Sequence, residues 1–557
     1  MTTTKRVDRH SSKSGNRLSK ANSQSPITNP IRRRILLLSP STVPSAPRIR
    51  TIVTFTDVVA AYAERVFDRC SEKGSDTQLL ADGIDLNTGK LITWNGEEVT
   101  SNLACQQNFL RTLEGLTSLT GDSSYRDRAD TWIADALPRI QHPESGLFYW
   151  GGHTSYDLIK DKPILGNHEM KCVYPHYPSL YRVAPKIMAR FIEANWHAHI
   201  WDWQTLLFNR HGEYESWEQR WNTQFKGGPV PITENSALSF VNTGSDLILS
   251  GAMMYALSGD ETALRWTNHL ISRYEDIRHP ETGLAGYQFN HRDPCRVRES
   301  FKKPYRDRED VNEVTVLTNN VIKVRYARAA VTFMNAFAAL DRNAGQPLLD
   351  LVTRDLTALS SHCYASGDHC FYPAINDGTR LTPEDSQEGA GYCPPSKLAP
   401  VPADGLLFLS YARAYNLTRG ESFRTTAESL AEGMGWKELE VPEAQESPAT
   451  EPDPHGWVNR GQNDVCALIG LLELYTATGE QRILESARSL GVQLFNKYNV
   501  DNWIVSHGRT GESNIDTALP LALLHLDAAE SDKRDDLPMF FPNNTYFDPK
   551  IVIRKRA

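Results

Sequence analysis

Three short stretches of the chain gather the side chains that most readily do metal or acid–base chemistry. They are YWGGHTSYDL (149–158), GNHEMKC (166–172) and NRHG (209–212). Each holds a histidine, namely His153, His168 and His211, and the second also holds Glu169. Imidazoles with one carboxylate suit divalent Mn, Fe, Co, Ni or Zn, whereas a pure calcium site uses oxygen ligands. A site of two histidines and one carboxylate is therefore available.

Spacing alone does not decide which histidines would bind a metal. The chain has 16 histidines and no HExxH motif, and a single histidine is more often a hydrogen-bonded structural residue than a ligand. His142 and His279 recur at the same position of two matching loops, so we expect them to close those loops. The two glycines before His153 permit a tight turn that would bring this side chain close to a partner.

The elements that must position these residues follow a repeated helical hairpin. Residues 110–147 and 247–284 share one layout: an apolar helix, a Thr/Ser-Gly-Asp turn, a second amphipathic helix and a His-Pro-Glu-x-Gly-Leu loop. The glycine can end the first helix in the left-handed conformation, and the aspartate can cap the second. Weaker copies of the pattern lie at 324–361, 407–434 and 465–498.

Stacked helical hairpins bury their apolar faces against one another, and enough of them close into a ring. The sequence therefore predicts an all-α fold, an (α/α) barrel of six or seven hairpins with minor β structure in its loops, as a single domain over 53–557. Long irregular stretches at 148–178, 207–245, 285–318 and 436–462 separate the hairpins. Loops of this length tend to be functional or disordered, and the first two are rich in Trp, Tyr, His and charged residues.

Composition excludes several classes of function. With a net charge of −8 and a pI near 6.1, the chain has no general attraction for nucleic acid or an acidic membrane surface. No apolar run approaches the roughly 18 to 20 residues that span a bilayer. The eight cysteines are scattered without a C-x-x-C pair, which favours reduced thiols and the cytoplasm.

The first 52 residues differ from the rest. The first fifty hold eleven Lys or Arg and a single Asp, together with many Ser, Thr and Pro. Such a segment buries too little apolar surface to fold, so a disordered basic tail is expected. The apolar part of RRRILLLSPSTVPSA is about four residues, short of the 7 to 15 of a signal peptide, so the expected location is cytoplasmic, with periplasm or secretion kept open.

Several linked motifs resemble polysaccharide lyase family two, the pectate lyases and pectate disaccharide-lyases. The matching stretches are NFLRTLEGLTSLTGD, GLFYWGGHTSYDL, NHEMKCVYPHYPSLYRV, RFIEANWHAHIWDWQTLLFNRHG and FVNTGSDLILSGA, within roughly residues 100–290. The resemblance implies an (α/α)7 barrel, β-elimination on homogalacturonan or its oligosaccharides to give 4,5-unsaturated products, and a divalent metal, typically Mn2+, with Mg2+ or Ca2+ as alternatives. It further implies that His153, Glu169 and His211 bind the metal and that Arg210 is the base.

The chemistry of elimination is consistent with these assignments but leaves the role of Arg210 open. The C5 proton of a galacturonate is α to a carboxylate, so its removal places charge on oxygens that a divalent cation stabilises. A guanidinium titrates above about pH 12 and is a poor base at neutral pH. Alternatively, Arg210 clamps the substrate carboxylate while Lys171 or a metal hydroxide removes the proton; either way an alkaline optimum is expected.

Further side chains are candidates for substrate binding. Lysine and arginine would bind the sugar carboxylates, and Tyr149 and Trp150 could stack on a sugar ring. The cationic candidates are Lys171, Lys323 and Arg325, with Arg182 in addition. The sequence indicates no oligomer and does not distinguish endo from exo action, although a cytoplasmic chain would favour exo release of disaccharides.

Two rival functions remain at this stage. An (α/α)-barrel glycoside hydrolase would use a pair of carboxylates, drawn from Asp157, Glu169, Glu213 and Glu215. A non-catalytic glycan-binding scaffold would not bring His153, Glu169 and His211 together.

Overall fold

The computed structural model describes residues 54–71, 77–94, 97–234, 237–293, 296–387, 392–442, 460–505 and 511–543. The chain divides into two units, Met1–Val53 and Thr54–Ala557, and all described residues belong to the second. The disordered tail expected over 1–52 and most of the stretch 436–462 therefore lie outside the described residues.

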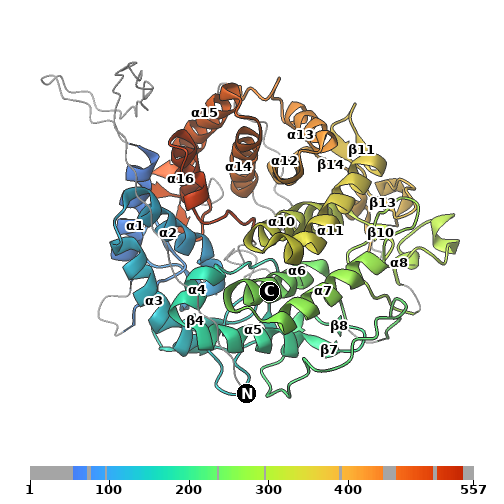
Figure 1. Cartoon of the computed structure of the whole chain (residues 1–557), viewed down its shortest axis with the longest axis horizontal. Helices are drawn as coiled ribbons and strands as arrows, with labels where there is room; N and C mark the ends of the chain where they lie inside the picture. The colour runs from blue at the N-terminus through green and yellow to red at the C-terminus, as the bar shows by residue number, and fades with distance from the viewer. Residues whose placement is uncertain are drawn as a thin grey trace, which may run out of the picture. The chain divides into compact units, whose positions relative to one another are not determined.

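Two sets of helices make up the described part of Thr54–Ala557 (Figure 1). The inner helices are α2 (Gln107–Thr120), α4 (Tyr177–Val183), α6 (Val241–Ser258), α10 (Ala330–Ala339) with the π-helix Ile322–Ala329 before it, α12 (Gly405–Thr418), α14 (Arg460–Thr478) and α16 (Leu519–Glu530). The outer helices are α1 (Phe55–Arg69), α3 (Ser124–Ile140), α5 (Pro185–His199), α7 (Glu261–Asp276), α11 (Arg342–His362), α13 (Glu421–Gly433) and α15 (Gln481–Tyr498). Each inner helix packs on the outer helix next to it in sequence, and α16 packs on α2 to close the ring.

The burial of the two sets explains this arrangement. In α6 the residues from Val241 to Met254 are all buried, as expected for a helix surrounded by protein on every side. In α7 only one face is buried, and the charged face is turned to solvent. The described helices thus form an (α/α) barrel, and the predicted fold class is confirmed.

The predicted helix boundaries are confirmed at the short turns. Gly121 and Gly259 have φ values of 75° and 77° and end α2 and α6 in the left-handed conformation. Asp260 caps α7 by accepting hydrogen bonds from the backbone N–H groups of Thr262 and Ala263. His142 and His279 accept backbone N–H groups of their own loops, which is the loop-closing role expected for them.

The two ends of the barrel differ. Short turns join each inner helix to the next outer helix, whereas long segments join outer helices to inner ones at the opposite end. These long segments hold the short strands β1 (Gly83–Asp85), β2 (Thr93–Trp94), β3 (Glu98–Ser101), β4 (Ser155–Asp157), β5 (Lys162–Ile164), β6 (His168–Glu169), β7 (Ile200–Asp202), β8 (Leu207–Phe208), β9 (His211–Gly212), β10 (Val316–Leu317), β11 (Tyr364–Ala365), β12 (Cys370–Phe371), β13 (Ala374–Ile375), β14 (Val401–Pro402), β15 (Asn499–Val500), β16 (Trp503–Ile504) and β17 (Glu512–Asn514). The minor β structure therefore lies in the loops, as predicted.

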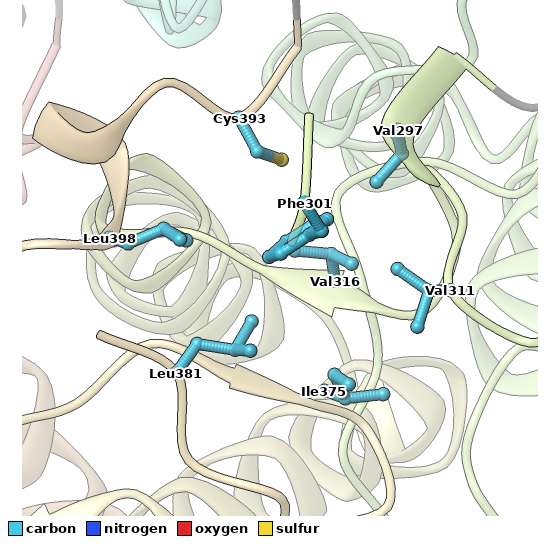
Figure 2. Packing of buried hydrophobic residues seen from close by; sticks show 8 residues of the cluster. All are labelled: Val297, Phe301, Val311, Val316, Ile375, Leu381, Cys393 and Leu398. Carbon is cyan, nitrogen blue, oxygen red and sulfur yellow. The ribbon is translucent and has the colours of Figure 1, made fainter. Parts of the chain in front are cut away.

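Two of these long segments share a hydrophobic cluster of their own. Its members are Val297, Phe301, Val311, Val316, Ile375, Leu381, Cys393 and Leu398, whose side chains Figure 2 shows. Strand β10 pairs antiparallel with β13, which joins the segment after α7 to the segment after α11. The described residues of 285–318 thus pack against a partner segment more than fifty residues away in sequence.

Other global expectations can be compared with the described residues. None of the cysteines among them forms a disulfide. No helix in this part of the chain is long and apolar enough to cross a membrane.

A buried ion triad at the short-turn end provides a test of stability. Glu473 of α14 is 4% exposed and lies 2.8 Å from Arg413 Nη1 and 2.5 Å from Arg534 Nη2. Burial by itself would raise the pKa of Glu473, but the two guanidinium groups outweigh it and hold the pKa well below its usual range. Replacing Glu473 with Gln leaves two cations without a counterion, which should cost about 3–5 kcal/mol of unfolding free energy.

This effect has a defined pH dependence. Because the folded-state pKa is depressed, the stabilisation is present above the unfolded pKa of about 4.3 and is lost as pH falls toward the folded value. Urea unfolding at pH 7 and pH 3 should therefore show a large difference between wild type and Glu473→Gln that shrinks in acid. Glu480, which is 29% exposed between Arg424 and Arg482, is the matched control, and Glu480→Gln should cost at most about 1 kcal/mol. Equal losses of unfolding free energy in Glu473→Gln and Glu480→Gln would contradict the role of Glu473 as a buried counterion.

Candidate metal centre

The turn that carries His153 is built directly on the backbone of Glu169. Gly151 has φ of 98°, and a Cβ atom at this position would lie 2.3 Å from Glu169 O, so only glycine fits. Gly152 N–H donates to Glu169 O over 3.2 Å. Asn102 fixes the other side of the turn, because its side chain both donates to Gly151 O and accepts from Gly151 N–H. The glycines therefore bring His153 to Glu169.

Strand pairing brings His211 to the same carboxylate. Strands β6 and β9 are antiparallel, and Glu169 lies directly opposite His211. Side chains of directly opposed residues lie on the same face of a sheet, so this pairing places both groups together. Gly212 allows the close approach of α5, since a Cβ atom there would lie 2.9 Å from His199 Nε2.

The three predicted ligands converge on one point. His153 Nε2 lies 3.3 Å from Glu169 Oε2, and His211 Nε2 lies 3.5 Å from Glu169 Oε1. One ligand atom from each residue lies within 4.8 Å of the other two. The Glu169 side chain is 3% exposed, whereas those of His153 and His211 are 43% and 28% exposed. The carboxylate thus forms the floor of the site and the imidazoles face its opening.

Two cations share the same carboxylate oxygen. Lys171 Nζ and Arg210 Nε each lie 3.5 Å from Glu169 Oε1. Burial alone would raise the pKa of Glu169, but the hydrogen bond from His211 and the charges of Lys171, His153 and Arg210 lower it to about 2. Glu169 is therefore ionised at any pH at which the protein would act.

His168 points away from this cluster and forms a buried hydrogen bond with His199. Neighbouring residues on a strand point to opposite faces, so His168 lies on the side opposite to Glu169. His199 Nδ1 donates to Asn209 O over 2.8 Å, which leaves its Nε2 to accept from His168 Nδ1 at 3.0 Å. Burial lowers the pKa of His199 to about 4 and that of His168 well below its usual value, so both rings are neutral. The pair links β6 to the residue before Arg210.

The donor set fits a divalent cation. Glu169 Oε1 meets His211 Nε2, Lys171 Nζ and Arg210 Nε only at 3.5 Å, the limit of hydrogen-bonding distance, although polar atoms in protein interiors normally have closer partners. Two imidazoles and one carboxylate suit a transition-metal ion better than calcium.

Comparison with known proteins now separates the candidate functions. The family model for periplasmic pectate lyases matches residues 77–550, most of the chain. The chain belongs to this pectate lyase family. The protein is thus a polysaccharide lyase, and the resemblance inferred from the sequence motifs is confirmed.

Individual relatives are more distant. The chain is 27% identical over 506 residues to the pectate disaccharide-lyase of Dickeya dadantii, covering 84% of this chain and 88% of that protein. Among solved structures, a Salegentibacter α-1,6-mannanase is 10% identical with a TM-score of 0.41, covering 86% of this chain and 99% of that one. The cellobiose 2-epimerase of Bacillus thermoamylovorans is 10% identical with a TM-score of 0.42, covering 85% and 98%.

Family membership corrects the expected location. The sequence predicted a cytoplasmic protein from its scattered cysteines and short apolar leader, but the family is one of periplasmic pectate lyases. The inference from cysteine to cytoplasm failed because a buried cysteine can remain a thiol for reasons of packing rather than of compartment. Most of the described cysteines of this lyase are buried.

The other predicted substrate residues of the lyase lie in different surroundings. Tyr149 is half-buried and stacks on Tyr214, with ring centroids 5.1 Å apart. Trp150 is fully buried, so its ring is not proposed as a sugar platform. Lys323 is half-buried in the π-helix before α10. Arg325 is buried and bonds to Asp355, so we do not propose it as a substrate contact either.

The remaining charged candidates also have structural partners. Arg182 of α4 pairs with Glu114 of α2 and Asp130 of α3. Asp157, a candidate for a hydrolase pair, is buried and accepts the backbone N–H groups of Ile159 and Lys160 after β4.

Proposed function

We propose that this pectate lyase is metal-dependent and that His153, Glu169 and His211 hold a divalent cation, with Mn2+ as the expected metal. The observation that supports this most strongly is the convergence of three ligand atoms within 4.8 Å, beside the cation Arg210. The three residues come from three separate segments, which the pairing of β6 with β9 and the turn at Gly151 bring together.

The reaction we propose is β-elimination on a galacturonate polymer or oligomer. A bound divalent cation would stabilise negative charge on the uronate carboxylate next to C5. In this step Arg210 first gives a proton to solvent and then accepts the C5 proton; the electrons of the C5–H bond form the C4–C5 double bond, and the C4–O bond breaks. The leaving oxygen takes a proton from solvent, and the product is a 4,5-unsaturated uronide.

Lys171 completes the arrangement. Its ammonium and the Arg210 guanidinium each lie 3.5 Å from the same oxygen of Glu169, and the Lys171 side chain is 13% exposed. In the proposed reaction it contributes positive charge toward the substrate carboxylate. The related D. dadantii protein is a pectate disaccharide-lyase, which supports the proposal that the products are unsaturated disaccharides.

The test is an absorbance assay with polygalacturonate and the purified full chain. A lyase produces a conjugated C4–C5 double bond, so near-ultraviolet absorbance should rise. Chelator should abolish the rise, and Mn2+ added after removal of the chelator should restore it. New reducing ends without absorbance would instead indicate a hydrolase, and full activity after chelation would contradict the metal. Chromatography of the products distinguishes disaccharide release from random cleavage.

A further inference from the structure

The segment that follows Glu169 has an unfavourable backbone conformation in a buried place. Cys172 and Tyr174 have φ values of 58° and 52°, in the left-handed region that non-glycine residues rarely adopt. Both residues are buried. Such a conformation persists only where the surrounding structure compensates for it.

The compensation comes from one buried carboxylate on α6. Asp246 accepts the backbone N–H groups of three consecutive residues, with distances of 2.6 Å to Cys172, 3.0 Å to Val173 and 3.0 Å to Tyr174. Alternation of backbone handedness makes successive N–H groups converge on one point, which creates a site for an anion. Asp246 is fully buried, and both of its carboxyl oxygens are directed at these N–H groups. Burial raises its pKa to about 7, although the three backbone hydrogen bonds oppose that shift.

The first turn of α6 holds the same segment from a second side. Thr243 Oγ1 donates to Met170 O over 2.9 Å, and Asn242 O accepts the N–H of Cys172 over 3.1 Å. Met170 lies between Glu169 and Lys171 in sequence. Helix α6 therefore fixes the backbone on both sides of Lys171 and immediately after Glu169.

We propose that Asp246 is a positioning residue for the catalytic centre, acting through the backbone of Met170–Tyr174 on Glu169 and Lys171. The proposal rests on the metal-dependent function proposed above and extends it to a residue that touches neither substrate nor metal. Buried groups that orient ligands typically change metal affinity or activity by 10- to 100-fold when they are replaced. Asp246 differs from an ordinary core residue because its hydrogen bonds go to three consecutive residues, the first of which lies three positions after the candidate ligand Glu169.

The test compares Mn2+ affinity of the full chain in wild type and three variants. Asp246→Asn places an amide group against converging N–H donors, and Mn2+ affinity should fall on the order of 10- to 100-fold. Activity should recover in part at high Mn2+. Thr243→Val keeps the shape of the side chain and removes one hydrogen bond to Met170, so it should weaken Mn2+ binding a few-fold even if Asp246→Asn fails to fold.

The control is Asp527→Asn. Asp527 of α16 also accepts a backbone N–H and a hydroxyl from a distant segment, both from Thr56, and it contacts none of the ligand segments. This variant should lose stability while keeping wild-type Mn2+ affinity. Wild-type Mn2+ affinity in both Asp246→Asn and Thr243→Val would overturn the proposal while leaving the metal-dependent function intact.

A second measurement covers the case in which the wild type binds no metal. Hydrogen–deuterium exchange of the metal-free proteins reports the backbone of residues 168–176 directly. The proposal expects faster exchange there in Asp246→Asn and Thr243→Val than in Asp527→Asn. Unchanged exchange would overturn it, whereas absent Mn2+ binding by the wild type would overturn the metal-dependent function instead.

Discussion

Replacing Arg210 with alanine should lower kcat for galacturonan cleavage on the order of 10³-fold, with Mn2+ affinity largely retained. The expectation follows from the geometry, because Arg210 lies 3.5 Å from Glu169 yet is not among the three converging ligands. A positioned general base typically contributes 10²- to 10⁴-fold to a rate. Initial rates by absorbance check the fall in kcat, and Mn2+ titration of the same preparation checks that metal affinity is retained.

A lysine at this position separates the two roles that the sequence left open. If Arg210 is the base, Arg210→Lys should retain weak activity whose alkaline rise occurs at lower pH, since lysine ordinarily titrates near 10.4 and arginine above 12. If Arg210 only clamps the carboxylate, Arg210→Lys should raise KM and leave both kcat and the pH profile nearly unchanged, because lysine keeps the charge but loses the bidentate geometry.

The same loop provides a matched control for Arg210. Arg220 is exposed, pairs with Glu218 at 3.1 Å and lies ten residues further along the chain. Arg220→Ala should keep the wild-type rate. Loss of activity in Arg220→Ala equal to that in Arg210→Ala would show that the loop as a whole, rather than one guanidine, is responsible.

The parts of the fold that could be predicted from the sequence are those encoded locally. The hairpins of α2 with α3 and α6 with α7 follow from apolar periodicity and from Gly121 and Gly259, which must adopt positive φ. Helix α4 was not predicted, because seven residues are too few to show a helical period. In the eight-residue π-helix before α10 every residue except Lys323 is buried, so no periodicity distinguishes it from a buried α-helix.

The candidate site shows the same division between local and distant information. Residue types and the family motifs singled out His153, Glu169, Arg210 and His211, and the structure brings these four side chains together. Their meeting depends on β6 and β9, which are two residues each and 42 residues apart, too short for any sequence signal. Asp246 was missed for a related reason. Its partners are backbone N–H groups, which nearly every residue type has and which therefore leave no signal in the sequence.

Replacing Glu169 with glutamine should have the most severe effect of any single change at the site. Glutamine has nearly the same shape but carries no charge, so the site loses its anionic ligand while His153 and His211 remain. Mn2+ affinity should fall by more than the roughly 100-fold expected for an outer positioning residue, and lyase activity should fall at least about 10³-fold. The loss should persist at Mn2+ concentrations that restore Asp246→Asn.

Stability should change in the same variant, for an electrostatic reason. In the metal-free protein the buried carboxylate of Glu169 neutralises Lys171 and Arg210, whose side chains are 13% and 33% exposed. Leaving these cations without a counterion should cost on the order of 3 kcal/mol of unfolding free energy. Solvent screening of the partly exposed Arg210 guanidinium reduces this cost. Glu218→Gln, on an 84% exposed side chain of the same loop, should alter neither activity nor stability. Retained Mn2+ binding with a loss of stability alone in Glu169→Gln would show that Glu169 is a counterion for the two cations and not a metal ligand. A counterion needs only its charge, whereas a ligand needs its charge at a fixed distance from the two imidazoles.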